Sequence, residues 1–207
     1  VITVALPSMR SGESLNATLV NAASQPKPAT PRYVDTPAVT LTVSLYGANG
    51  SVLTKAIDLR TLAQTAGAAA PNPWLQGQLG QERRYTAEID GNLQAEFDVF
   101  TPVSGPARVD VIMHNDWTTV TRSATKTYDV DVRVGGASVF QASSVKHYPY
   151  ATWHQLIWTD GAPDVRMQPD VAQLIAAAAI PRYDQKFTIT STVRNDIEAM
   201  SAQTQRL

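Results

Sequence analysis

The sequence predicts a mainly β fold: an antiparallel β-sandwich with one or two short C-terminal helices. Several short segments alternate apolar and polar residues, which is the period of a half-buried strand. Turn signals that contain glycine separate these segments roughly every ten residues, a spacing typical of sandwiches. The first clear helical pattern begins only near Pro169. This order, with short turns between strands, favours antiparallel pairing over βαβ units.

The N-terminal region precedes the clearest strands. Residues 1–6 (VITVAL) are predicted to form an opening strand that ends at Pro7. Residues 21–37 contain four prolines, which block regular structure and favour an extended loop. Long loops in compact domains often make contacts. This Pro-rich loop is therefore either a mobile surface segment, which we favour, or a contact loop.

The remaining strands follow in order along the chain. They are residues 39–46 and 51–59, joined by a turn at 47–50; 83–90 and 93–100, joined at Gly91–Asn92; 107–115; 126–134 and 137–145, joined at Gly135–Gly136; and 152–158. Two-residue loops that contain glycine are strong hairpin signals, because glycine accepts a positive φ. Residues 61–73 are predicted to be an Ala-rich connection that ends in turn residues.

Two helices are predicted after the strands. The first begins at Pro169 and Asp170, because proline and an acidic residue suit the first turn, and it ends at Pro181. Residues 187–193 are predicted to form a late strand. A second helix then begins at an N-cap, for which Asn195 and Asp196 are both candidates.

The predicted domain organisation is one sandwich and one extension. We expect residues 1–184 to form the sandwich, and residues 185–207 to form an extension that contacts a partner or a following domain. Because the chain begins with Val1, we expect it to be processed, trimmed or part of a longer polypeptide.

Composition narrows the classes of function. Lys and Arg number 17 against 18 Asp and Glu, so no basic field predicts nucleic-acid binding. The absence of cysteine excludes disulfides, thiolate metal sites and a cysteine nucleophile. The longest apolar run, Leu174–Ile180, is too short to span a bilayer. Phosphate-binding loops and the common hydrolase and metalloprotease motifs are also absent.

Two small sets of polar residues could form a catalytic or metal site, and each could instead have a purely structural role. His114–Trp117 (HNDW) ends a predicted strand and could supply a metal or acid–base pair, although Asn and Asp are also ordinary turn residues. Asp129 and Asp131 lie two apart on one strand face, as paired catalytic acids or Ca²⁺ ligands would. We favour the structural interpretation of both, because outer sheet faces commonly carry paired charges.

Residues 146–160 (KHYPYATWHQLIWTD) are the densest aromatic stretch. Its candidate ligand-binding residues are His147, Tyr148, Tyr150, Trp153, His154 and Trp158. Because side chains alternate along a strand, Trp153 and Trp158 are predicted on opposite faces unless a bulge intervenes. Only the rim 147–150 is then exposed for a ligand, and the strand is buried on both sides. A core or interface role is favoured over a sugar platform, and a zinc site from His147 and His154 lacks further ligands.

Several segments together resemble a known kind of protein. They are Trp74–Gly77 followed by Glu82, Asn115–Trp117, Tyr128–Gly136, His147–Trp158 and Ile180–Asp184. This pattern resembles uncharacterised bacterial and phage-borne proteins in which a β-sandwich precedes further domains, and its first part is similar to N-terminal sandwich regions of polysaccharide lyases. The resemblance implies a sandwich module in a larger extracellular or virion-associated protein, and it carries over no catalytic residue.

The expected function is non-catalytic contact. We expect a structural module of a virion, tail or cell-surface assembly, with protein partners in a homo- or hetero-oligomer. The alternatives are a carbohydrate-binding or accessory domain of a polysaccharide-degrading protein and, third, a hydrolase that uses Asp or His. No cofactor, metal, nucleic acid or membrane insertion is predicted.

Overall fold

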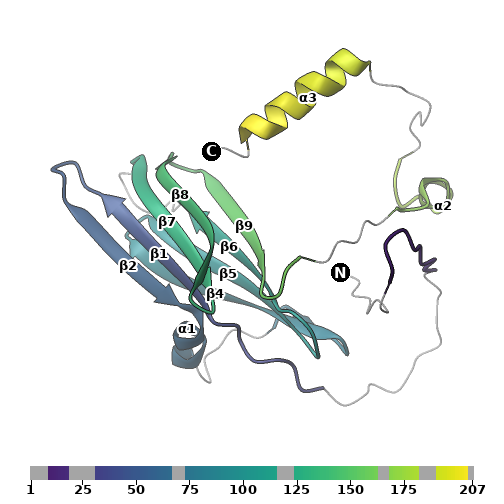
Figure 1. Cartoon of the computed structure of the whole chain (residues 1–207), viewed down its shortest axis with the longest axis horizontal. Coiled ribbons are helices and arrows are strands. Elements are labelled where there is room, and N and C mark those ends of the chain that lie inside the picture. Colours follow the sequence, from purple (N-terminus) through teal and green to yellow (C-terminus); the bar gives the residue numbers. More distant parts are fainter. Residues whose placement is uncertain are drawn as a thin grey trace. The chain divides into compact units, whose positions relative to one another are not determined.

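The chain forms two compact units, residues 1–162 and 163–207. The computed structural model describes residues 9–18, 31–66, 73–115, 124–162, 168–181 and 190–204. The first unit is a sandwich of two antiparallel sheets (Figure 1), which confirms the predicted fold class. The predicted strand at residues 1–6 and the predicted domain boundary after Asp184 lie outside the described residues.

Four strands form the first sheet, in the order β2-β1-β7-β8. They are β1 (Val39–Tyr46), β2 (Val52–Asp58), β7 (Lys126–Val134) and β8 (Ala137–His147). All neighbours pair antiparallel, and both predicted hairpins of this sheet are confirmed. Gly135 and Gly136 both have positive φ, 57° and 89°, as a tight two-residue turn between β7 and β8 requires.

Five strands form the second sheet, in the order β3-β4-β5-β6-β9. They are β3 (Leu75–Gln76), β4 (Gly80–Asp90), β5 (Leu93–Pro102), β6 (Arg108–His114) and β9 (Thr152–Trp158). β4 begins three residues before the predicted start. Gly80 is needed there because an added Cβ would lie 2.5 Å from the Phe100 ring on the neighbouring strand.

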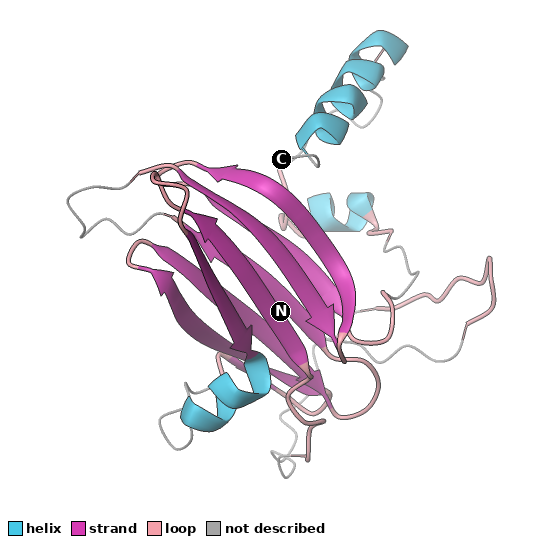
Figure 2. Cartoon of the chain, turned by 60° about the vertical axis from the view of Figure 1, so that its left-hand side comes forward, coloured by secondary structure: helices cyan, strands magenta, loops and turns pink. Residues whose placement is uncertain are grey.

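The core lies between the two sheets. The strands with a clear apolar alternation bury their apolar face, as β1 shows with Val39, Leu41 and Val43 fully buried. Phe140 of the first sheet contacts Trp153 of the second, with ring centroids 6.0 Å apart. In Figure 2 the strands of both sheets lie alongside one another, with a helix at one end. Burial of these alternating faces supplies the main driving force for folding.

The predicted connection at residues 61–73 is wrong in its first half, because Leu59–Ala66 form helix α1. Asp58 caps this helix by accepting the Thr61 N–H at 2.7 Å. Leu59 is fully buried, and three further residues at helical spacing pack against the core: Leu62, Ala63 and Ala66. The helix therefore covers one end of the sandwich (Figure 1).

The second unit contains two helices. α2 (Val171–Ala176) has the predicted start, with Asp170 accepting the Gln173 N–H at 3.0 Å, but it is shorter than predicted. Ala178 has a φ of 54°, which ends the helix before Pro181. α3 (Ser191–Thr204) includes residues predicted as strand 187–193, of which 187–189 lie outside the described residues.

The start of α3 also corrects the predicted cap. Asn195 and Asp196 lie inside the helix, since the Arg194 N–H already donates to the Thr190 carbonyl. Ser and Thr before a helix are as suitable for an N-cap as Asn or Asp, so the sequence offered competing starts. Among the described residues, no helix has the length and apolar character needed to cross a bilayer.

Candidate contact site

A buried polar bridge joins the two sheets where β8 meets β9. Trp153 of β9 donates its indole N–H to the Tyr128 hydroxyl of β7 at 2.6 Å. Tyr128 Oη in turn lies 2.9 Å from His147 Nδ1, and His147 Nε2 lies 2.8 Å from the Ala151 carbonyl oxygen. Burial raises the pKa of Tyr128, so its hydroxyl keeps its proton.

This arrangement fixes the tautomer of His147. An indole N–H can only donate and a carbonyl can only accept. Tyr128 therefore accepts from Trp153 and donates to His147 Nδ1, and His147 donates from Nε2 to Ala151. Every polar atom of the bridge then has a partner with the histidine neutral.

A β-bulge explains why His147 is inside. Phe140 and Ala142 face the core, but the register of β8 against β7 shifts between Tyr128 and Val130. Ser144 has a φ of 54° in this bulge, and its N–H donates to Asp129 at 2.7 Å. The extra residue reverses the side-chain phase, so that the odd-numbered residues that follow face inward.

The burial of His147 corrects the predicted exposed rim at 147–150. His147 is only 3% exposed, whereas Tyr148 and Tyr150 are 61% and 69% exposed. The histidine is therefore part of the support, and the two tyrosines alone are presented to solvent. We define Tyr148–Ala151 as the tyrosine turn.

The tyrosine turn is a tight turn with an unusual residue in it. The Ala151 N–H donates to the Tyr148 carbonyl at 3.2 Å, which closes a four-residue turn with Pro149 at its second position. Tyr150, at the third position, has a φ of 61°, in the left-handed region that favours glycine. An aromatic residue in that region costs about 1–2 kcal/mol.

Asn115, at the end of β6, holds the turn in place. Asn115 is fully buried; its carbonyl accepts the Tyr150 N–H at 2.8 Å, and its N–H donates to Ala151 at 3.2 Å. Its side-chain amide donates to the carbonyls of His147 and Ala124 at 2.9 and 3.0 Å. Hydrogen bonds from the backbone and from the side chain of Asn115 therefore hold the strained turn in place.

β9, the strand after the turn, confirms the prediction that Trp153 and Trp158 lie on opposite faces. β9 pairs with β6 in an unbroken register, from Thr152 opposite His114 to Trp158 opposite Arg108. Trp153 faces the core, and His154 and Trp158 face outward. The predicted burial of this strand on both sides is wrong, since Leu156 on the outer face is 44% exposed. The two tryptophans form no common platform.

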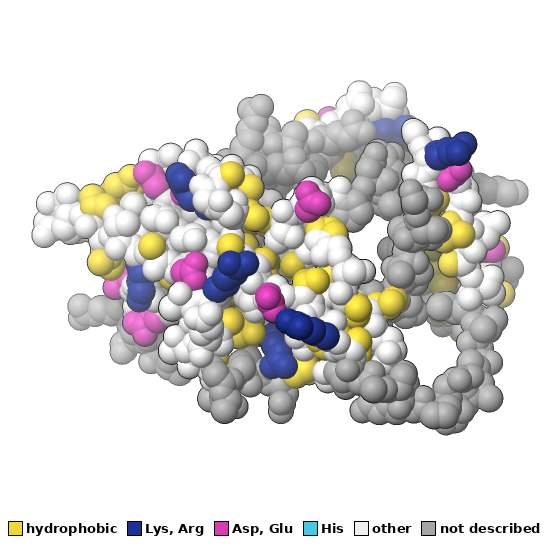
Figure 3. Space-filling view, turned by 60° about the horizontal axis from the view of Figure 1, so that its bottom comes forward, with side chains coloured by type: hydrophobic (Ala, Val, Ile, Leu, Met, Phe, Trp, Pro, Cys, Tyr) yellow, Lys and Arg dark blue, Asp and Glu magenta, His cyan; other side chains and the backbone are white. Residues whose placement is uncertain are grey.

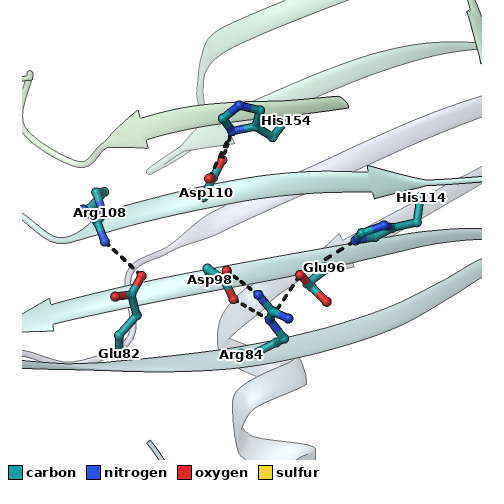
Figure 4. Close-up of polar contacts among 8 residues, drawn as sticks. All are labelled: Glu82, Arg84, Glu96, Asp98, Arg108, Asp110, His114 and His154. Atoms are coloured by element: carbon teal, nitrogen blue, oxygen red, sulfur yellow. Dashed lines mark hydrogen bonds and ion pairs between the residues drawn. The ribbon is translucent and has the colours of Figure 1, made fainter. Parts of the chain in front are cut away.

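The outer face of the second sheet carries a ladder of ion pairs (Figure 4). Arg84 of β4 binds both oxygens of Asp98 on β5 at 2.7 Å, and it also contacts Glu96 at 3.1 Å. The hydrogen bond to Asp98 raises the pKa of Arg84, which keeps the guanidinium charged. Arg108 binds Glu82 at 2.9 Å across the same face.

Histidines extend this ladder at two places. His154 Nδ1 lies 3.0 Å from Asp110, and His114 Nε2 lies 3.7 Å from Glu96. In Figure 3, acidic and basic side chains also alternate with apolar ones on the face shown, with no large field of one sign among the described residues there. Paired charges of this kind suit a solvated or contact face rather than an acid–base site.

The two other polar sets fit the structural interpretation that we favoured. Asp129 accepts from the Tyr46 hydroxyl and from Ser144, and Asp131 accepts from Arg133 and Ser138, both at 2.6 Å. In the HNDW set, Asn115 supports the turn, while Asp116 and Trp117 lie outside the described residues. In the part of the chain that the structure describes, no three His, Asp or Glu side chains are grouped as metal ligands.

Sequence reasoning missed Tyr128 and Asn115 as members of this site. Alternation along residues 126–134 indicates only an inward position for Tyr128, and Asn115 fits an ordinary turn residue. A signal was present for the turn itself, since Tyr-Pro-Tyr places proline at the position that tight turns favour. Comparisons with protein-family models, with curated proteins and with solved structures find no match to this chain.

Proposed function

We propose that this protein is a non-catalytic β-sandwich that binds a protein partner through the tyrosine turn. The observation that carries the proposal is Tyr150, an exposed aromatic residue in a backbone conformation that favours glycine. Strain that the surrounding structure holds in place is a mark of functional positions. A residue that served only to close the turn would be glycine or asparagine.

The chemistry of the turn suits contact. Tyrosine brings a large apolar ring and a hydroxyl at low cost in side-chain entropy, and it is enriched at protein interfaces. Tyr148 and Tyr150 lie on a turn that the buried bridge and Asn115 fix, so little further ordering is needed on binding. The wider setting, a virion, tail or cell-surface assembly, rests on the sequence resemblance.

The test is a substitution that separates stability from binding. Tyr150→Gly removes the ring and relieves the strain. We expect it to raise the free energy of unfolding by about 1 kcal/mol, measured by urea denaturation. The same variant should lose self-association, followed by light scattering across protein concentrations, or lose partners captured from an extract of the producing organism and identified by mass spectrometry.

Two controls complete this test. Tyr148→Ala removes the other exposed ring without relieving strain, and should weaken association while leaving stability unchanged. Val139→Ala removes a side chain that is 50% exposed on β8 and should change neither readout. Association that survives in both tyrosine variants would rule out the turn as the contact.

A glycan is the second candidate ligand. Two exposed tyrosine rings on one turn could stack on the apolar face of a sugar ring. A glycan array probed with the wild type, Tyr148→Ala and Tyr150→Gly distinguishes this candidate from a protein contact. Binding that Trp158→Ala abolishes and the tyrosine variants retain would instead move the site to the outer face of β9.

A further inference from the structure

β4 is an edge strand of the second sheet along most of its length. It runs from Gly80 to Asp90, but β3, its neighbour on this side, pairs only with Gln81 and Glu82. Among the residues that the structure describes, no strand pairs with this side of β4 from Arg84 onward. A long open edge presents N–H and C=O groups to which another strand can bind. The opposite edge of the same sheet is β9, the strand that follows the tyrosine turn.

One hydrogen bond shows which residues of β4 turn their backbone to this side. The Gly77 N–H donates to the Gly80 carbonyl at 2.9 Å and closes the turn between β3 and β4. The backbone groups of successive residues point to opposite sides of a strand, and β4 stays in register with β5 up to Glu88. The exposed residues Arg84, Thr86 and Glu88 therefore direct their N–H and C=O groups away from β5. We define Arg84–Glu88 as the β4 edge.

Other edges of the sandwich are blocked in familiar ways. The bulge at Ser144 distorts β8, and Lys55 lies within β2; both features discourage pairing with another strand. Helix α1 also contacts β4, but it turns Leu62, Ala63 and Ala66 to the core. The helix thus closes the sandwich between its two sheets and adds no strand to the β4 edge.

The sequence of the β4 edge complements itself in the antiparallel direction. If a second copy pairs about a two-fold axis at Thr86, this residue lies opposite its own copy, and Arg84 lies opposite Glu88 on both sides of the axis. Cross-strand threonine pairs and opposite-charge pairs each stabilise a sheet. An axis at Arg84 or at Glu88 would instead place like charges opposite one another, which is destabilising. The charges therefore disfavour those two registers and favour the axis at Thr86.

We infer that two copies of this chain pair through the β4 edge, about a two-fold axis at Thr86, so that their second sheets become continuous. Because Arg84, Thr86 and Glu88 all direct backbone groups to this side, each of the facing pairs is hydrogen-bonded through its main chain. The same segment serves both copies, as a two-fold interface requires. β3 limits the paired segment at one end, and the register shift between Glu88 and Asp90 limits it at the other.

The first test uses the absence of cysteine from this chain. Thr86→Cys places two thiols across the axis, where the Cα atoms of a hydrogen-bonded pair lie about 5.5 Å apart, within the roughly 4.4–6.8 Å that a disulfide spans. With oxidised glutathione, the full chain should form a disulfide-linked dimer on a non-reducing gel. Thr54→Cys, at an exposed threonine of the edge strand β2, is the matched control and should cross-link roughly 10-fold more slowly or less.

Light scattering of variants without cysteine gives the second measurement. Glu88→Arg replaces both unlike pairs by like pairs and should raise the dimer Kd by roughly 10-fold, whereas charge reversal on β2, Lys55→Glu, should leave it within about 2-fold. Thr86→Pro removes an N–H that points away from β5 and no hydrogen bond of the β4–β5 ladder. This variant should keep a cooperative urea transition and lose the dimer.

The dimer is independent of the tyrosine turn, which lies at the other edge of the sheet. The cross-link at residue 86 should therefore persist in Tyr150→Gly, and association through the turn is followed in the Thr86→Pro background. Equal cross-linking at residues 86 and 54, or a chain that stays monomeric at every concentration, would overturn the inference. A dimer that neither Glu88→Arg nor Thr86→Pro weakens would overturn it as well.

Discussion

At the scale of single residues, Tyr128 is the member of the buried bridge with two roles. Its hydroxyl accepts a hydrogen bond from Trp153 of the second sheet and donates one to His147 of its own sheet. Tyr128 is also the side chain that links the two others, because Trp153 donates to it from the second sheet and His147 bonds to it and to the Ala151 carbonyl. Removal of this one hydroxyl therefore leaves two buried partners unsatisfied.

We expect Tyr128→Phe to lower the free energy of unfolding by about 2–4 kcal/mol, because buried groups that lose their partners pay a desolvation cost. Urea denaturation measures the loss. The matched control is Tyr46→Phe, which removes an exposed hydroxyl bonded to Asp129 and should cost much less. Equal losses in the two variants would show that the bridge adds nothing to stability.

Asp129 has a pH-dependent role in the bulge that turns His147 inward. Hydrogen bonds from Tyr46 and then from Ser144 lower the pKa of this carboxyl, and the bond to Asp129 raises the pKa of Tyr46. A lowered carboxyl pKa stabilises the fold above about pH 4, and this contribution is lost as the pH falls further. The stability that comes from the raised pKa of Tyr46 is present below about pH 10 and is lost as the pH rises further.

The stability of the wild type should therefore exceed that of Asp129→Asn at neutral pH, and the two should converge at acidic pH. Urea midpoints measured across acidic and neutral buffers give the difference. The effect is small, because Tyr46 is exposed to solvent and Asp129 is partly exposed. A difference that stays constant down to pH values well below 4 would contradict the role assigned to this carboxylate.

At the scale of elements, helix α1 depends on its cap. Asp58 accepts the Thr61 N–H, and this hydrogen bond lowers the pKa of the carboxyl. Asp58→Ala should destabilise the protein by about 1 kcal/mol, the usual cost of losing an N-cap, when measured by urea denaturation. Asp58→Asn keeps a capping oxygen and should retain most of the stability, so a comparable loss there would show that the cap is not the cause.

At the scale of the whole molecule, the core belongs to the first unit alone. The buried apolar residues that the structure describes lie between Pro37 and Ile157. A chain that ends at Ala162 should therefore unfold cooperatively, with the same urea midpoint and slope as the full chain. A lower midpoint or aggregation of the shorter chain would show that residues 163–207 contribute to the sandwich.

The sequence was informative wherever local pattern controls structure. Strand alternation predicted the buried faces of β1, β6 and β7, and glycine indicated the hairpin turns. Helix α1, which the sequence analysis missed, also has local signals in the sequence: the Asp58 cap and the helical spacing of Leu59, Leu62 and Ala63. The alanine and threonine residues of that stretch are also common in loops, and the stretch was therefore predicted to be a connection.

The sequence by itself determined two features. The antiparallel sandwich follows from short turns between alternating strands, and the separation of Trp153 from Trp158 follows from the two-residue period of a strand. Only the tertiary structure decided that His147 is inside the core and that Tyr150 takes a positive φ. Each of these depends on a residue distant in the chain, Asp129 at the bulge and Asn115 beside the turn. Local periodicity carries no information about such contacts, and so the site became visible only when the two sheets were brought together.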